Sequence, residues 1–199
     1  MARLSISFAA FLLTAFTGAV PVTATVINFE AQAAGRAGSF TGTSDSPFTI
    51  GSAIFNGGEL LNAEIGLDAD RTGIYASQGL FGSSETNPLI ISFASPVNAF
   101  SVLLVNGDDM RSYTVSDDLG NSITMPVASA GALGAAVFSL PGQGLQKVYI
   151  SSANTDAWDF AIDNVSFTPV ASTPEPESWL LVGAPFALLI FFRRRRAST

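Results

Sequence analysis

A period-two alternation of apolar and polar residues restricts the fold of this chain more than any other feature. The alternation occurs in short runs separated by Gly, Pro, Asn and Asp, and no stretch shows the 3.6-residue spacing of an amphipathic helix. The clearest runs are 89–93, 97–105, 113–115, 123–125, 135–140, 145–151 and 160–167. Many short strands at regular intervals predict an all-β fold, an antiparallel β-sandwich.

The run 97–105 has apolar residues on both faces, which is typical of a central strand. We expect the strand 89–93 to end at Ser95-Pro96, and the run 97–105 to form an antiparallel meander with 113–115 and 123–125. A turn at Pro141–Gly144 predicts a hairpin of 135–140 with 145–151. Apolar parity changes between Ile162 and Val165, so we expect a β-bulge at Asp163-Asn164.

The first third of the chain is harder to interpret. Strands are expected at 26–29, 48–50 and 53–55, with a turn at 56–58. The segment 31–46 is rich in small residues and predicts a long loop. The segment 59–69 is compatible with an irregular helical turn or with a loop, and its sequence does not decide between them.

The N-terminus has the pattern of a secretory signal peptide, spanning residues 1–24. Arg3 precedes a mostly apolar segment at 4–20, and Val22 and Ala24 are small residues at the two positions that a signal peptidase reads. We expect a signal helix, cleavage after Ala24 and export. The alternative is a buried N-terminal helix.

The segment 25–170 is long enough for one β-sandwich domain. It contains no cysteine, so its stability comes from packing rather than disulfides. Residues 25–173 carry fourteen acidic and four basic side chains, a net charge of −10. Such a surface repels nucleic acid, which we exclude as a partner.

Histidine and cysteine are absent from the whole chain. Their absence excludes Ser-His-Asp and Cys-His catalysis, and every His- or Cys-ligated zinc site. Carboxylates remain, in the groups Asp68/Asp70, Asp108/Asp109, Asp117/Asp118 and Asp156/Asp159/Asp163. A carboxylate pair could serve a polysaccharide-active enzyme, but adjacent acidic residues on turns are more often turn formers.

Residues 179–192 form an apolar run of 14 positions, about 21 Å long as a helix. A bilayer core needs about 30 Å, so this is a short transmembrane helix. Trp179, the first residue of the run, is expected at headgroup level, and a cluster of arginines, Arg193, Arg194, Arg195 and Arg196, follows the run on the cytoplasmic side. One interpretation is a simple C-terminal anchor.

The segment before that run favours a second interpretation. Pro174, Glu175 and Pro176 form a stiff, extended lead-in. Pro-Glu-Pro, a short apolar span and a terminal arginine cluster together resemble the PEP-CTERM sorting signal, here within the linker and tail 171–199. The resemblance implies processing by an exosortase-like transpeptidase of a Gram-negative bacterium. It implies passage through the inner membrane to the cell surface or extracellular matrix, in an exopolysaccharide or biofilm setting. Pro185 lies within the span, where a proline kinks a helix. It therefore favours a transient signal over a permanently stable anchor.

The strands at 27–30, 89–97 and 160–167 together resemble the jelly-roll, galactose-binding-like domains that often precede such tails. That resemblance implies a structural calcium held partly by Asp163. Calcium prefers several oxygen ligands, and the remaining candidates are Glu30, Asp156, Asp159 and Asn164. Glu30 can join only if the ends of the domain lie close together.

Trp158 lies among these carboxylates, so it could stack on a sugar, or it could cap the core. Our main expectation is therefore an exported, non-catalytic surface or matrix protein. The alternatives are a carbohydrate- or calcium-binding adhesin module and, less favoured, a polysaccharide-active enzyme.

Overall fold

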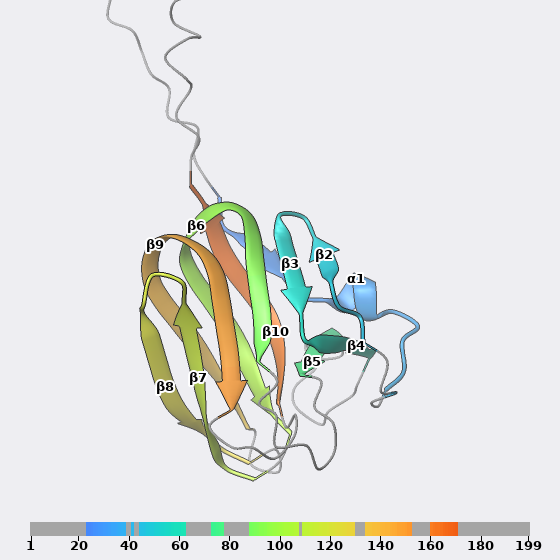
Figure 1. Ribbon diagram of the computed structural model, residues 1–199. Coiled ribbons are helices and arrows are strands. Elements are labelled where there is room, and N and C mark those ends of the chain that lie inside the picture. Colours follow the sequence, from blue (N-terminus) through green and yellow to red (C-terminus); the bar gives the residue numbers. More distant parts are fainter. Residues whose placement is uncertain are drawn as a thin grey trace, which may run out of the picture.

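The computed structural model describes residues 23–38, 41, 44–62, 73–77, 88–107, 109–129, 134–152 and 160–170. In these residues a single short helix accompanies ten strands, all paired antiparallel in one sheet (Figure 1). In chain order the elements are β1 (Thr25–Ile27), α1 (Glu30–Ala33), β2 (Phe48–Ile50), β3 (Ala53–Asn56), β4 (Gly58–Asn62), β5 (Gly73–Ser77), β6 (Leu89–Asn106), β7 (Arg111–Asp117), β8 (Ser122–Val127), β9 (Ala135–Ser152) and β10 (Phe160–Pro169).

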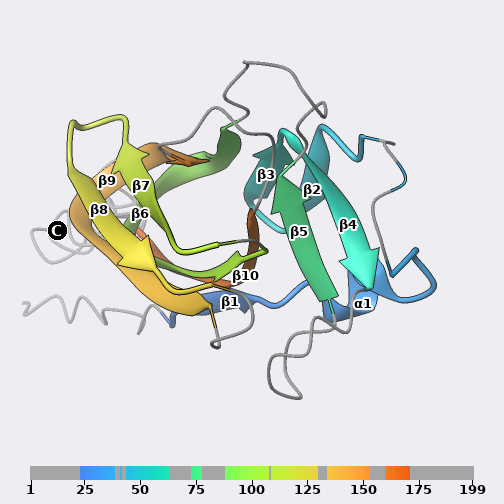
Figure 2. The same ribbon diagram turned by 90° about the horizontal axis from the view of Figure 1, so that it is seen from below.

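The sheet curls over to make two layers, because its two longest strands run through both of them (Figures 1 and 2). In the first layer the order is β8, β7, the second half of β9, the first half of β6, β3 and β2. The second layer contains the first half of β9, the second half of β6, and β10, followed by β5 and β4. The expectation of an all-β, antiparallel, two-layered fold is confirmed; jelly-roll connectivity stays a prediction.

The strands β6 and β9 bend together where they pass from one layer to the other. Their register shifts three times between Ser92 and Phe100. Ala99 has a φ of 51° and Gly144 a φ of 77° at this bend, and the Gly144 amide donates to Asn98 Oδ1 at 2.8 Å. Strands that change layers do so through such bulges.

Two sequence-based predictions fail at this bend. Pro96 does not end a strand, because β6 continues through it. The segments 135–140 and 145–151 are not a hairpin but one bent strand, β9, since both pair with β6. Pro and Gly weaken regular pairing in the same way at a bend as at a turn.

The predicted meander is also wrong in its first step. β7 pairs with β8, as expected, but its other neighbour is β9 rather than β6. The central strand β6 instead lies between β9 and β10 over 97–106, which agrees with its apolar residues on both faces.

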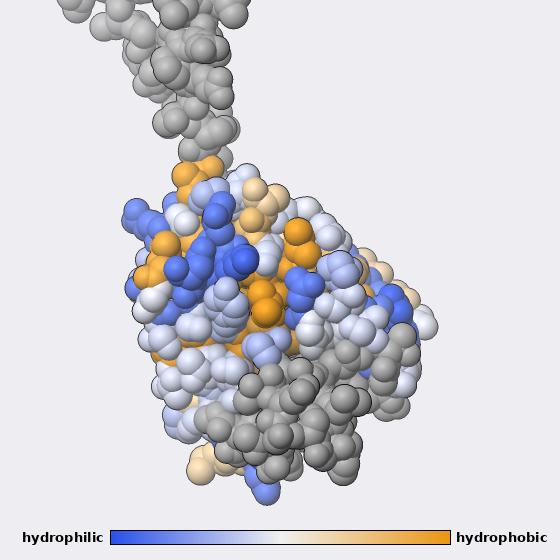
Figure 3. Space-filling model, in the orientation of Figure 1, coloured by the Kyte–Doolittle hydropathy of each residue, from blue (hydrophilic) through white to orange (hydrophobic). Residues whose placement is uncertain are grey.

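One core fills the space between the layers. Its largest fully buried side chains include Tyr75, Tyr113, Phe29, Phe55, Phe100, Phe138 and Phe167. Along β9, Val148 and Ile150 are buried and Lys147 is exposed, as the alternation predicts. On the face seen in Figure 3, apolar patches lie between hydrophilic residues.

The region upstream of β6 holds strands that the sequence analysis did not identify. Residues 58–62 form β4, neither helix nor loop, and β5 was not predicted at all. The expected loop 31–46 begins with the last three residues of α1, a helix of four residues. α1 packs beside β4 and β5 (Figure 2).

The two ends of the described domain lie side by side. Thr25 pairs with Phe167, and the Val170 amide donates to the Pro96 carbonyl at 3.2 Å. Both ends leave at the top of Figure 1. No helix among the described residues is long and apolar enough to cross a membrane; the predicted signal helix, apart from its last two residues, and the span 179–192 lie outside those residues.

Candidate functional site

The predicted bulge at Asp163-Asn164 is confirmed, and it is where β10 changes partners. Pairing of β10 with β6 shifts register between Asp163 and Ser166, and Asn164 has a φ of 48°. Before the bulge Ile162 pairs with Tyr75 of β5, and after it Val165 pairs with Ile27 of β1. Because of the bulge, Ile162 before it and Val165 and Phe167 after it all point into the core, although they stand at positions of opposite parity. This explains the change in the apolar pattern.

Asp163 is fully buried at this junction. Its Oδ1 accepts the Asn164 amide at 2.6 Å, and its Oδ2 accepts Asn164 Nδ2 at 3.3 Å. A buried carboxylate needs such donors, because desolvation otherwise penalises its charge. The bulge thus turns the Asp163 carboxylate onto its own backbone.

Glu30 reaches the same junction from α1. It lies three residues beyond Ile27, and its Oε1 accepts the amide of Gly73, the first residue of β5, at 2.9 Å. A Cβ at Gly73 would stand 2.7 Å from the Glu30 backbone nitrogen, so only glycine allows this approach. Since β1 pairs with β10, the condition that the domain ends lie close is met.

The described residues do not complete a calcium site. Among them no group of three or more acidic side chains is placed to hold a metal ion. Asp156 and Asp159, the other expected carboxylate ligands, lie outside the described residues, as does Trp158. The junction therefore contributes the carboxylates of Glu30 and Asp163, both of which already accept backbone amides.

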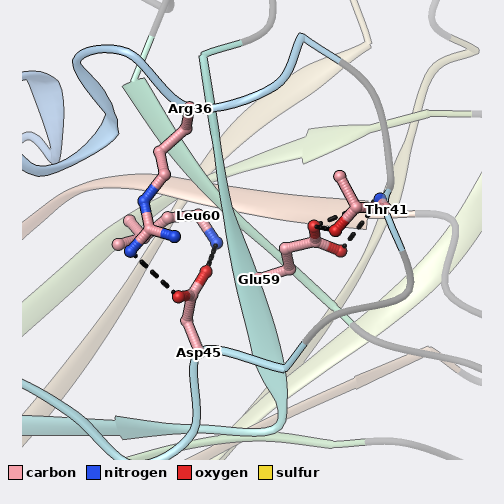
Figure 4. A network of polar contacts seen from close by, with 5 residues as sticks. All are labelled: Arg36, Thr41, Asp45, Glu59 and Leu60. Atoms are coloured by element: carbon pink, nitrogen blue, oxygen red, sulfur yellow. Dashed lines mark hydrogen bonds and ion pairs between the residues drawn. The ribbon is translucent and has the colours of Figure 1, made fainter.

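A second polar network, which no sequence pattern predicted, covers the outer edge of β4 (Figure 4). Asp45 Oδ2 accepts the Leu60 amide at 2.9 Å, and Asp45 Oδ1 forms an ion pair with Arg36 at 3.0 Å. Glu59, only 3% exposed, accepts the backbone amide of Thr41 at 3.1 Å and also its hydroxyl. The backbone adds bonds from the Asn62 amide to the Ala37 carbonyl and from the Asp45 amide to the Gly58 carbonyl.

This network takes the place of a neighbouring strand. An exposed strand edge presents unpaired amides that other chains can pair with. Here a loop whose composition predicted no structure supplies the Asp45 carboxylate and the Ala37 carbonyl as acceptors to that edge, and the Thr41 and Asp45 amides as donors. No local pattern in 31–46 signals this, because the partners lie about 15 residues later in the chain.

Asp117 and Asp118 hold a turn and its neighbouring strand. Asp117 Oδ1 accepts the amides of Leu119 and Asn121, at 3.0 and 2.8 Å. Asp118 Oδ1 accepts the amides of Gln146 and Lys147 on β9, at 3.0 and 3.2 Å. Both carboxylates are thus used to hold backbone, as Asp does in Asx-type turns.

Of the other acidic groups, Asp109 is exposed beyond the end of β6, and its carbonyl accepts Asn106 Nδ2 at 2.7 Å. Asp68, Asp70 and Asp108 lie outside the described residues. So do all eight residues of the predicted sorting signal, Pro174 to Arg196. Ala24, the predicted cleavage position, is described and exposed.

Burial shifts the pKa of Tyr75 by a large amount. Burial raises its pKa from 10.0 to about 12, opposed by the Gly58 amide, which donates to its hydroxyl oxygen at 3.0 Å. The raised pKa favours the neutral phenol in the folded state. The contribution of Tyr75 to the free energy of unfolding is therefore fully present below pH 10. It falls by about 1.4 kcal/mol per pH unit between pH 10 and 12, because there the Tyr75 phenol ionises in the unfolded chain but not in the folded one.

We expect the free energy of unfolding to fall by about 2 kcal/mol more in the wild type than in Tyr75→Phe between pH 9.5 and 11.5. The measurement is urea unfolding of both proteins at each pH, with the difference between them removing the contributions of other groups. Equal pH slopes in the two proteins would contradict a raised Tyr75 pKa.

Comparison with known proteins does not place the chain in a family. No family model matches it, and no curated protein does. Among solved structures, a family 29 carbohydrate binding module is 9% identical with a TM-score of 0.40, over 74% of this chain and 92% of the module. A family 35 carbohydrate binding module from Clostridium thermocellum is 12% identical with a TM-score of 0.40, over 74% of this chain and 99% of the module.

An exo-β-1,3-galactanase from Phanerochaete chrysosporium is 13% identical with a TM-score of 0.36. The match covers 60% of this chain and only 30% of the galactanase chain. At these TM-scores the likenesses assign the chain to none of these families.

Proposed function

We propose that this chain is an exported, non-catalytic protein of the cell surface or extracellular matrix, sorted through a C-terminal PEP-CTERM signal and associated with exopolysaccharide. The observation that carries the proposal is the order of parts in the tail. The sequence Pro174-Glu175-Pro176, a short apolar span and four arginines follow a segment with the pattern of a signal peptide and a domain-sized segment. The exosortase-like enzyme, signal peptidase and inner membrane are the partners this order requires.

The geometry of the domain is compatible with this route. Pro174 is five residues beyond Pro169, the end of β10. Thr25, the first residue after the predicted cleavage, pairs at that same end. The two described ends of the domain therefore lie on one side, which in this proposal is the side that faces the membrane.

The use of the carboxylates supports a non-catalytic role. Glu30, Asp45, Glu59, Asp117, Asp118 and Asp163 each accept at least one backbone amide. A general acid or base must exchange protons with a substrate, whereas these groups hold loops and strand ends. This weighs against the alternative of a polysaccharide-active enzyme that uses Asp117 and Asp118.

The intact mass of the exported protein tests the proposal. In a host with its exosortase, we expect the mass of a chain that begins at Thr25 and ends near Pro174. In the same host without the enzyme, the mass should extend to Thr199, because the tail is retained. A mass extending to Thr199 in both hosts would make residues 179–192 an ordinary anchor and overturn sorting by processing.

A second candidate function is a carbohydrate- or calcium-binding adhesin module. It is favoured by the positions of Ser152 and Phe160, which flank the segment containing Trp158. The end of β9 and the start of β10 lie at the end of the layers opposite the start of β1 and the end of β10 (Figure 1). A ligand site between them would face away from the membrane.

This candidate predicts that Trp158→Ala abolishes retention on immobilised host exopolysaccharide, and that calcium raises the melting temperature of residues 25–173. Tyr149→Ala is the matched control, because Tyr149 is a partly exposed aromatic residue elsewhere on β9. Equal retention of the wild type and both variants, with no calcium effect on melting, would reject the adhesin function.

A further inference from the structure

The predicted signal cleavage site adjoins a strand that is part of the folded sheet. Thr25, Val26 and Ile27 pair with Phe167, Ser166 and Val165 of β10. Ile27 is 5% exposed and belongs to the core, whereas Val26 is 62% exposed. No residue separates Ala24 from this pairing.

We propose that docking of β1 on β10 protects the Ala24–Thr25 bond from signal peptidase, so that the signal is removed rapidly only before the domain is complete. This inference rests on the proposed export of the chain. It concerns the order of two events, cleavage and folding, rather than whether either occurs.

The argument starts from what a peptidase requires of its substrate. In the cleavage step, water adds to the Ala24 carbonyl carbon and the C–N bond to Thr25 breaks, leaving a carboxylate on Ala24 and an ammonium group on Thr25. Peptide recognition by strand addition uses the backbone of an extended segment. In the folded chain the backbone after the bond is already paired with β10, so cleavage must wait for local opening.

Opening β1 is costly because of Ile27. Its side chain lies in the core cluster with Phe29, Val165 and Phe167, and releasing the strand returns this apolar surface to water. Thr23 and Ala24 are exposed, so accessibility before the bond is not what limits cleavage. Within the part of the chain that the structure describes, the obstruction lies on the side after the bond.

The chain order supplies the time in which cleavage can occur. The partner of Thr25 is Phe167, which is 142 residues later in the chain. During export from the N-terminus, β1 emerges first and β10 last. The bond is therefore accessible throughout translocation, and it becomes protected when β10 arrives.

The test uses the full chain in its host and a reversible signal-peptidase inhibitor. Precursor is accumulated under inhibition, given time to fold, and then released by washing the inhibitor out. We expect its cleavage to be at least about tenfold slower than that of newly made, pulse-labelled precursor, because cleavage then follows local opening. Equal rates for the two populations would overturn the proposal.

A matched pair of variants identifies β1 docking as the cause. Ile27→Asp places a charge in the core and releases β1, so the accumulated precursor should be cleaved as fast as new precursor. Val26→Asp places the same charge one residue nearer the bond, but on an exposed position, and should keep the slow cleavage. A slow Ile27→Asp precursor would contradict the inference.

The wild-type comparison needs no variant, so it stands even if Ile27→Asp fails to fold. Failure of the export proposal is also distinguishable. If no population, new or accumulated, is ever cleaved after Ala24, the signal peptide itself is wrong. If new and accumulated precursor are cleaved at the same rate, the export proposal is retained, and the proposal that folding slows cleavage is rejected.

Discussion

Replacing Asn106 by alanine should lower the free energy of unfolding by about 3 kcal/mol. Asn106 is fully buried at the end of β6. Its Nδ2 donates to the carbonyls of Asp109, Ala128 and Val127, at 2.7, 2.9 and 3.3 Å, and its Oδ1 accepts the Tyr113 hydroxyl at 2.7 Å. The variant removes these bonds and leaves the partners with unpaired polar groups, which costs more than losing the bonds alone.

Tyr113→Phe is the control, since it removes only the hydroxyl and should cost about 1 kcal/mol. The double variant should cost less than the sum of the two, because the residues are in contact. Urea unfolding of residues 25–173, followed by far-ultraviolet circular dichroism, measures all three. A loss below 1 kcal/mol for Asn106→Ala would show that water replaces its contacts.

The largest packing effect is expected for Phe55→Ala, at about 3–5 kcal/mol. Phe55 is fully buried on β3. Its ring centroid lies 5.1 Å from that of Phe29 and 5.6 Å from that of Tyr75, both edge-on. The ring thus joins β3 in one layer to Tyr75 of β5 in the other, and its loss opens a cavity between the layers.

Phe48→Ala provides the comparison for this variant. Phe48 belongs to the same cluster, with its ring 6.2 Å from Phe55 and 6.3 Å from Tyr75, but it is only partly buried. In thermal unfolding, the free energy of unfolding should fall by less than half as much as in Phe55→Ala, because part of the Phe48 side chain already contacts water. Similar losses at both positions would contradict the assignment of Phe55 as the contact between layers.

Of the polar junction at β10, the sequence predicted the bulge and two of its carboxylates. The parity change around Asp163 is a local signal, because it depends only on neighbouring residues of β10. Local signals did not reveal that Glu30 would accept the Gly73 amide, because that contact spans 43 residues. The edge network of Asp45 and Glu59 went unpredicted for the same reason.

The sequence by itself determined the class of fold, the faces of the strands and the placement of the bulge, because alternation and parity are properties of neighbouring residues. It did not determine which strands pair. Pro141 to Gly144 carry the same local preferences in a hairpin and in a bend, and only the pairing of β9 with β6 on both sides of them makes one strand. Pairing across the curled sheet depends on burying a shared core, and that free energy is defined only when the whole domain is assembled.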